Sequence, residues 1–322
     1  MNFTCRRVIL QLLLVVILFS SVTACSGFRH RAYDMAMGME RMGTGLTPAS
    51  FNVDDFEISV LEGNRRGERP TLVLIHGFGA SKEVWLRFAR YLKDEFHIIA
   101  IDLPGHGEST KNLDKDYHIL SQVAYLRAIL TEMKVDKPHL AGNSMGATIV
   151  AYYAAHYPEE ITSITLFNPA GISTHESELM QLLAMDKNPL IIEKKSDYEQ
   201  LIRFTMKKKP FLIWPITSML AEKAFLNRSI NEKIFNDAQL KESLLHDMHG
   251  FNEILCSVRI PTLIIWGKHD RLVNVKNAKI FNERIPDSRL VILDEAGHTP
   301  MFETPRASAK IVGDFALEIM GH

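Results

Sequence analysis

The stretch Gly142-Asn143-Ser144-Met145-Gly146 decides the fold of this chain. The apolar segment 139–143 leads into the serine, and the small-residue segment 147–155 follows it with the composition of a helix. A serine between a strand and a helix, with a glycine two residues away on each side, is typical of a sharp and strained turn. The glycines are needed because neighbouring backbone comes too close for a side chain. The sequence predicts a turn that holds the Ser144 hydroxyl clear of the strand, as a candidate nucleophile.

The chain on both sides of this turn alternates between strand-like and helix-like patterns. Residues 56–60 alternate with period two, and apolar residues recur at helical spacing in 84–92 and 123–133. Continuous apolar runs separated by amphipathic helices indicate an α/β fold, with a mostly parallel central sheet flanked by helices. The apolar runs that we predict as buried strands are 70–75, 97–101, 139–143, 161–167, 261–266 and 290–293.

The alternation stops between Gly171 and about Gly250, where helical patterns continue without a convincing strand. We therefore predict a helical cap at 172–250, inserted after the sixth strand between two parts of one core, at 51–171 and 251–322. Such an insertion would lie over the carboxyl ends of the strands, where α/β sheets bind ligands. The cap sequence 204–220 is rich in aromatic and aliphatic residues around Lys207-Lys208-Lys209, which suits contact with lipid, although simple packing explains it as well.

Two polar residues follow late strands and fit the roles of acid and base. Asp270 comes just after the run that ends at Trp266, and His298 comes just after the run 290–293. His298 would take the proton of the serine, and Asp270 would orient the imidazole and stabilise its charged form. Asp294 is the alternative acid, and His269 is interpreted as a bystander.

A serine nucleophile also needs backbone N–H groups that stabilise the oxyanion of the tetrahedral intermediate. The residue after the nucleophile, Met145, supplies one candidate donor. The loop His76-Gly77-Phe78-Gly79 follows an early strand, and its glycines let the chain turn an N–H inward. We predict Phe78 as the second donor and interpret the His76 side chain as structural.

The N-terminus has the order of an export signal. Arg6 and Arg7 precede the apolar run 8–19, and small residues then lead to Cys25. This order resembles a bacterial lipoprotein signal, which implies removal of 1–24, acylation of Cys25 and anchoring by several acyl chains. Ser26 would favour the outer membrane in a Gram-negative cell. An uncleaved single-pass anchor over 8–24 is the alternative, and 25–50 is interpreted as a tether or linker, or as a short helix on the membrane.

Composition excludes several classes of function. The 322 residues carry 37 basic and 38 acidic side chains, a net charge of -1, which gives no footprint for nucleic acid. The three cysteines, at 5, 25 and 256, form neither a disulfide framework nor a metal-ligand pattern. Cys256 is predicted to be a small buried hydrophobe. No cofactor or metal is implied, and the oligomeric state stays open.

These motifs together resemble the α/β-hydrolase superfamily over residues 51–320, and within it the membrane-bound monoacylglycerol lipase branch and related bacterial lipases. The resemblance implies a serine hydrolase with a triad in the chain order Ser144, Asp270, His298. One departure is Ala147, where relatives often carry glycine. The motifs that carry the resemblance are 76–78 with Lys82 and Trp85, 102–106, 144–146, 168–171, 265–270 and 297–298.

The function predicted from this resemblance is hydrolysis of carboxylic esters, such as monoacylglycerols, through an acyl-enzyme. One alternative is a carbon–carbon bond hydrolase of the meta-cleavage type, which shares the Gly-Asn-Ser-Met-Gly turn. Other serine acyl hydrolases, such as thioesterases and peptidases, are further alternatives. A binding module that has kept the fold without catalysis belongs to a different class, and it usually loses a member of the triad.

Overall fold

The computed structural model describes residues 27–63, 69–208 and 216–321. They form one eight-stranded sheet in the order β1-β2-β4-β3-β5-β6-β7-β8. The pairs β1–β2 and β2–β4 are antiparallel and every other pair is parallel. The fold class predicted from the sequence is confirmed. The strands are β1 (Leu46–Val53), β2 (Phe56–Gly63), β3 (Thr71–Ile75), β4 (His97–Ile101), β5 (His139–Asn143), β6 (Ser163–Phe167), β7 (Thr262–Gly267) and β8 (Ser288–Leu293).

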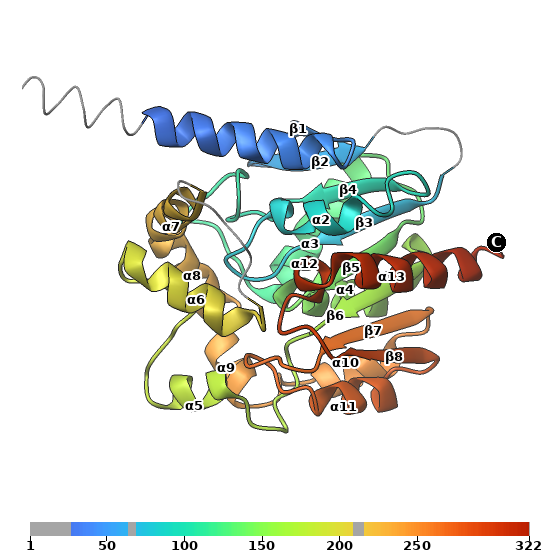
Figure 1. Ribbon diagram of the computed structural model, residues 1–322. Coiled ribbons are helices and arrows are strands. Elements are labelled where there is room, and N and C mark those ends of the chain that lie inside the picture. The colour runs from blue at the N-terminus through green and yellow to red at the C-terminus, as the bar shows by residue number, and fades with distance from the viewer. Residues whose placement is uncertain (1–26, 64–68, 209–215, 322) are drawn as a thin grey trace, which may run out of the picture.

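Helices cover both faces of this sheet because its central strands are buried on both sides. Every residue of β4, β5 and β6 is buried, as expected for parallel strands between two helical layers. Two separate clusters of apolar side chains result, one on each face. Figure 1 shows α2, α12 and α13 in front of the sheet. The core helices are α2 (Leu86–Ala89), α3 (Ile119–Glu132), α4 (Met145–His156), α10 (Phe251–Ser257), α11 (Asn277–Arg284), α12 (Pro300–Glu303) and α13 (Pro305–Ile319), with short turns η1 (Lys82–Trp85) and η2 (Pro158–Glu160).

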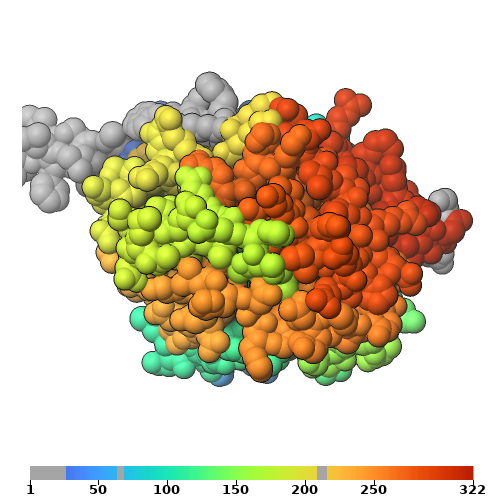
Figure 2. Space-filling view, turned by 90° about the horizontal axis from the view of Figure 1, so that it is seen from below, coloured from blue at the N-terminus to red at the C-terminus, as the bar shows by residue number. Residues whose placement is uncertain are grey.

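A group of helices is inserted between β6 and β7, as the sequence predicts. Figure 1 shows them at one end of the sheet, and Figure 2 shows this group (yellow-green to light orange) beside the second part of the core (orange to red). We call this group the cap; its limits at 172 and 250 stay a prediction. Its elements are α5 (Glu178–Ala184), η3 (Lys195–Asp197), α6 (Tyr198–Thr205), α7 (Ile216–Leu226), α8 (Arg228–Asp237) and α9 (Leu240–Leu245).

Of the alternatives for 25–50, a loose linker or a short helix, the described residues have the helix, and the predicted limit at residue 50 is wrong. Residues 27–42 are helical, and β1 begins at Leu46 rather than after residue 50. Tyr33 is buried and Met37 packs against the apolar cluster that contains Leu46. The methionines and the scarcity of β-branched residues, which suggested a loose segment, are equally typical of a helix. The signal segment 1–24 and Cys25 lie outside the described residues.

The prediction for Cys256 is also wrong, because its side chain is exposed. Cys256 lies on α10, whose buried residues are Phe251 and Leu255. Successive helical positions are about 100° apart, so the residue after Leu255 turns away from the core. Within the described residues, no helix has both the length and the apolar character needed to cross a membrane.

Candidate active site

Ser144 occupies a strained turn between β5 and α4. Its φ is 55° and its ψ is -120°, outside the regions that non-glycine residues usually adopt. The flanking glycines leave no room for a side chain. A Cβ on Gly142 would lie 2.3 Å from the Gly146 carbonyl oxygen, and one on Gly146 would lie 2.4 Å from the His76 carbonyl oxygen. The predicted turn, and the need for both glycines, are therefore visible in the backbone.

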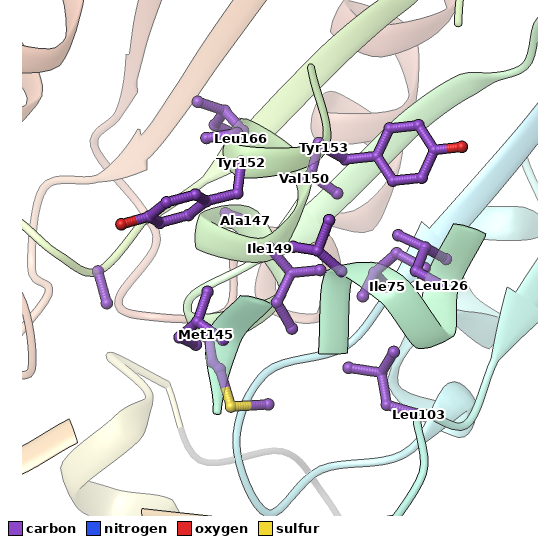
Figure 3. Close-up of a cluster of buried hydrophobic side chains, with 14 of the residues drawn as sticks. Ile75, Leu103, Leu126, Met145, Ala147, Ile149, Val150, Tyr152, Tyr153 and Leu166 are labelled. Atoms are coloured by element: carbon purple, nitrogen blue, oxygen red, sulfur yellow. The ribbon is translucent and has the colours of Figure 1, made fainter. Parts of the chain in front are cut away.

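A tightly packed cluster of buried apolar side chains supports the Ser144 turn. Figure 3 shows side chains of α4 between neighbouring strands and helices, with Met145 at the edge of the cluster. Because such a core is close-packed, it resists movement of the helix and holds the strained residue in place. The labelled members are Ile75, Leu103, Leu126, Met145, Ala147, Ile149, Val150, Tyr152, Tyr153 and Leu166.

Asp270 and His298 are joined as the sequence predicts. The Nδ1 atom of His298 lies 2.8 Å from Oδ2 of Asp270, and both side chains are buried. Since a carboxylate oxygen only accepts, Nδ1 carries the proton and Nε2 of the neutral ring is free to accept another. The alternative acid, Asp294, is exposed and pairs with Lys268 at 2.8 Å. His269 is exposed, and its interpretation as a bystander stays a prediction.

Backbone N–H groups and one side-chain amide hold the Asp270 carboxylate. Its Oδ1 accepts from the N–H of Leu272 at 2.8 Å and of Val273 at 3.1 Å. Its Oδ2 accepts from Nδ2 of Asn168 at 2.5 Å. Nδ2 of Asn168 also donates to the Gly297 carbonyl oxygen, and its Oδ1 accepts from the Gly267 N–H, each at 3.3 Å. Asn168 therefore connects the loops that carry the acid and the base.

Sequence analysis did not assign a role to Asn168, Asn143 or Glu303. Asn143 Nδ2 donates to the His298 carbonyl oxygen at 3.1 Å, which ties the serine turn to the histidine loop. Glu303 accepts from the N–H groups of Gly297 at 2.9 Å and Thr299 at 3.2 Å, on either side of His298. Asn168 follows the carboxyl end of β6 just as Asp270 follows β7, and this position was the available signal.

The loop after β3 lies against the serine. A Cβ on Gly77 would be 3.2 Å from the Cβ of Ser144, so Gly77 lies directly against the serine. Phe78 is the next residue in the chain. The His76 ring ties the loop to the next one: its Nε2 accepts from the Leu103 N–H at 3.1 Å, and its Nδ1 donates to the Gly77 carbonyl oxygen at 2.8 Å. Burial lowers the pKa of His76, which favours this neutral, structural form.

A buried ion pair fixes the same two loops. Lys82 Nζ lies 2.6 Å from Asp102 Oδ2, and both side chains are inaccessible to solvent. The Lys82 N–H also donates to Asp102 Oδ1 at 2.7 Å, and Glu108 accepts from Lys82 Nζ at 2.9 Å. Removing one partner would leave an uncompensated buried charge, so the pair makes displacement of either loop costly.

The cap touches both halves of the site. The Phe235 ring of α8 packs edge-on against Phe78, with centroids 5.6 Å apart. At the end of α6, the Thr205 carbonyl oxygen accepts from the His298 N–H at 2.9 Å. The Lys207 N–H donates to Glu303 at 2.7 Å, so this carboxylate holds the cap and the histidine loop together. Movement of the cap would therefore disturb the surroundings of the candidate base.

Two lysines of the cap, Lys207 and Lys208, form ion pairs with a carboxylate of the same chain. Glu295 accepts from Lys207 Nζ at 3.1 Å and from Lys208 Nζ at 2.8 Å. These contacts hold the pKa of Glu295 down, at about 2. Two of the three lysines that suggested binding to lipid headgroups therefore have a partner within the chain. Among the described residues, His, Cys, Asp and Glu side chains form no group of three that could hold a metal ion.

Comparison with known proteins identifies relatives over most of the chain. Residues 70–305 match the family described as alpha/beta hydrolase fold. The chain is 31% identical to monoacylglycerol lipase ABHD6 of Mus musculus over 279 residues, which cover 83% of this chain and 81% of that protein. It is 32% identical to Lipase 1 of Psychrobacter immobilis over 243 residues, which cover 75% of this chain and 74% of that protein.

One solved crystal structure is also similar to this chain over nearly its whole length. The crystal structure of a protein described as a membrane phospholipase A and a bacterial virulence factor superposes with a TM-score of 0.88 at 33% identity. The match covers 98% of this chain and 100% of that chain.

Proposed function

The chain belongs to the alpha/beta hydrolase fold family, and from this premise we propose that it is a serine lipase or esterase that cleaves lipid esters through an acyl-enzyme. One observation carries the proposal: the hydrogen bond of 2.8 Å between His298 Nδ1 and Asp270 Oδ2, in a loop tied to the strained Ser144 turn. This arrangement leaves Nε2 of His298 as a proton acceptor for a serine hydroxyl.

The proposed reaction uses these groups in two steps. Ser144 Oγ attacks the ester carbonyl carbon while His298 Nε2 takes its proton, and Asp270 stabilises the imidazolium. The N–H groups of Met145 and Phe78 stabilise the oxyanion. His298 then gives the proton to the leaving alcohol, and the acyl group stays on Ser144. A water molecule, deprotonated by His298, releases the carboxylic acid and restores the serine.

The substrate class is inferred from the relatives and from the cap. The matched proteins include a monoacylglycerol lipase and a bacterial lipase, which are 31% and 32% identical to this chain over the aligned residues. Apolar cap side chains such as Phe235 lie beside Phe78, where a lipid chain would enter. We propose single-chain lipid esters, with monoacylglycerols as the first to test and the cap at 172–250 as the lid.

We further propose that the protein is attached to a membrane through its N-terminus. The order of charged, apolar and small residues before Cys25 supports a lipid anchor on that cysteine. The similarity to a protein described as a membrane phospholipase A supports a membrane location as well. The cell envelope, and the outer membrane in a Gram-negative cell, is the proposed site.

The test is hydrolysis of p-nitrophenyl esters, from acetate to palmitate, by the full chain in detergent. Ser144→Ala should reduce the rate about 10⁴-fold or more, because the nucleophile is lost. Ser257→Ala, an exposed serine on α10, is the matched control and should keep the parental rate.

The chain-length profile separates the remaining possibilities. Activity that peaks at medium or long acyl chains and disappears in Ser144→Ala would support a lipid-directed esterase. Activity on acetate alone would favour another acyl hydrolase. Substantial hydrolysis by Ser144→Ala would reject the assigned nucleophile, and no hydrolysis by the parent chain would favour carbon–carbon bond cleavage or a binding role.

A further inference from the structure

The helix at 27–42 carries large apolar side chains on its outer side. Phe28, Met35, Met39 and Met42 are 59%, 64%, 62% and 77% exposed. Successive members are seven, four and three residues apart, which places them along one face of a helix. We call these four residues the stripe. Contiguous exposed apolar side chains of this size are uncommon on a protein that contacts only water.

The opposite face fixes this helix to the rest of the molecule. Tyr33 is buried, and Met37 packs against the apolar cluster on one face of the sheet. Arg41 Nε donates to Glu83 at 3.1 Å, and Glu40 accepts from Arg90 at 3.1 Å. Because these contacts set the rotation of the helix, the stripe points away from the protein. Figure 1 shows the helix (blue) along the outside of the molecule.

The first turns of the helix bind the cap. Arg29 Nη1 donates to Ser218 at 3.1 Å and lies 3.8 Å from Glu222, both on α7. Lys223 Nζ donates to the Tyr33 hydroxyl at 3.2 Å. Leu226 lies one turn beyond Glu222 and is 71% exposed. The contacts of Arg29 and Tyr33 therefore fix the start of the helix to α7 of the cap.

The proposed anchor determines what the stripe faces. Cys25 precedes Phe28 by three residues, so an acylated Cys25 would hold Phe28 within about 11 Å of the membrane surface. An uncleaved anchor that ends at residue 24 would place it equally close. A helix over 27–42 is about 24 Å long, and lying flat it would bring all four side chains of the stripe to the lipid.

We propose that the helix at 27–42 lies in the interface of the membrane, with the stripe among the upper parts of the acyl chains. The inference rests on the proposed membrane attachment and names the surface that makes the contact. Amphipathic helices bury an apolar face about 5–10 Å into this region. Through its contacts with α7, the helix then holds one end of the cap at the lipid surface. Lys207 and Lys208 pair with Glu295, and the contact through the helix needs neither of them.

Fluorescence quenching by brominated lipid tests the proposal without any need for catalysis. The full chain is reconstituted in vesicles of phosphatidylcholine that carries bromine on its acyl chains. Met35→Trp and Met39→Trp each place a reporter in the stripe. Met185→Trp is the matched control, because Met185 is also 64% exposed but follows α5 of the cap. Fluorescence is compared with that of the parent chain in the same vesicles, because the parent has three tryptophans of its own.

The added fluorescence of Met35→Trp and Met39→Trp should fall by about half in brominated vesicles, while that of Met185→Trp should not change. Quenching of all three variants to the same degree, or of none, would overturn the proposal. A second copy of the chain that covered the stripe would shield both reporters and give the latter result. Hydrolysis of p-nitrophenyl butyrate by each variant confirms folding, and its absence in the parent chain would count against the proposed function but not against the membrane contact.

Discussion

The strain at Ser144 and the polar support around Asp270 are two parts of one arrangement. A non-glycine residue at φ 55° is costly, and it persists only where its surroundings fix it. Here the Ser144 N–H donates to the Phe167 carbonyl oxygen at 2.9 Å. Asn143 and Asn168, immediately before the serine and immediately after Phe167, bind the loops of His298 and Asp270. The positions of all three candidate catalytic side chains therefore depend on two buried amides.

Asn168 offers a test of this dependence. Replacing it with glycine should lower kcat about 10- to 100-fold with little change in KM, because the Asp270 carboxylate loses a charge-assisted hydrogen bond. Glycine is the informative substitution since Asn168 has a φ of 45°, which alanine would adopt only with added strain. The measurement is steady-state hydrolysis of p-nitrophenyl butyrate.

Asn168→Ala provides the comparison for that experiment. It lacks the same amide, so it should lose a similar factor in kcat. Its free energy of unfolding should in addition be about 1 kcal/mol lower than that of Asn168→Gly. Parental kcat in Asn168→Gly would show that the amide is not needed to position Asp270.

The strand β5 and the helix α4 lie so close together at Gly142 that adding a side chain there should lower the stability of the protein. Gly142→Ala would place a Cβ 2.3 Å from the Gly146 carbonyl oxygen, so the strand and the helix would have to separate. We expect a loss of about 2–3 kcal/mol in the free energy of unfolding, measured by urea denaturation. Gly38→Ala is the control, since its Cβ would have no neighbour within 4 Å. The control should gain about 0.5–1 kcal/mol, because Gly38 lies inside a helix. Equal stability of both variants would contradict this account.

The contacts of the helix at 27–42 could not be predicted, because they are few and join residues that are far apart in the sequence. Tyr33 and Met37 are its inward residues, and the partners of Arg41 and Glu40 lie on elements more than forty residues later. Large apolar residues lie on both the inner and the outer side of this helix, so they do not mark a single buried face. The prediction at Cys256 failed for a related reason, since a single helical position decides between burial and exposure.

The whole molecule should lose stability in weak acid because it buries neutral histidines. His139 lies beside Ser163, with Nδ1 2.7 Å from the hydroxyl oxygen, and burial lowers its pKa to about 4. An unfolded histidine titrates near 6.5, so between these values the unfolded chain binds a proton that the folded chain does not. Stability therefore falls as the pH falls from about 6.5 to about 4, by about 3 kcal/mol for this residue. Burial lowers the pKa of His76 and His106 as well, which adds loss of the same sign.

His139→Gln should remove one part of this dependence. The difference in urea unfolding free energy between pH 7 and pH 4.5 should be smaller than in the parent chain by about 2–3 kcal/mol. The exposed His249→Gln should behave like the parent. An unchanged pH dependence in His139→Gln would show that this side chain is not kept neutral by the fold.

The sequence alone predicted the sheet and the cap because both depend on strong local patterns. The runs at 97–101 and 139–143 are β4 and β5 with the same limits. The placement of Ser144, Asp270 and His298 followed from strand ends, which also share one edge in the structure. What could not be predicted is which side-chain amides bridge those ends, because Asn168 and Asn143 act through partners more than a hundred residues away.

The helix at 27–42 also determines how tension on the N-terminus reaches the protein. Only residues 43–45 separate it from β1, the edge strand of the sheet. A pull from an anchored N-terminus would first meet the contacts of Arg29 and Tyr33 with α7, and then those of Glu40 and Arg41 with the core. These contacts would therefore take up the force before it reached β1, and three further strands separate β1 from β5, the strand that ends next to Ser144.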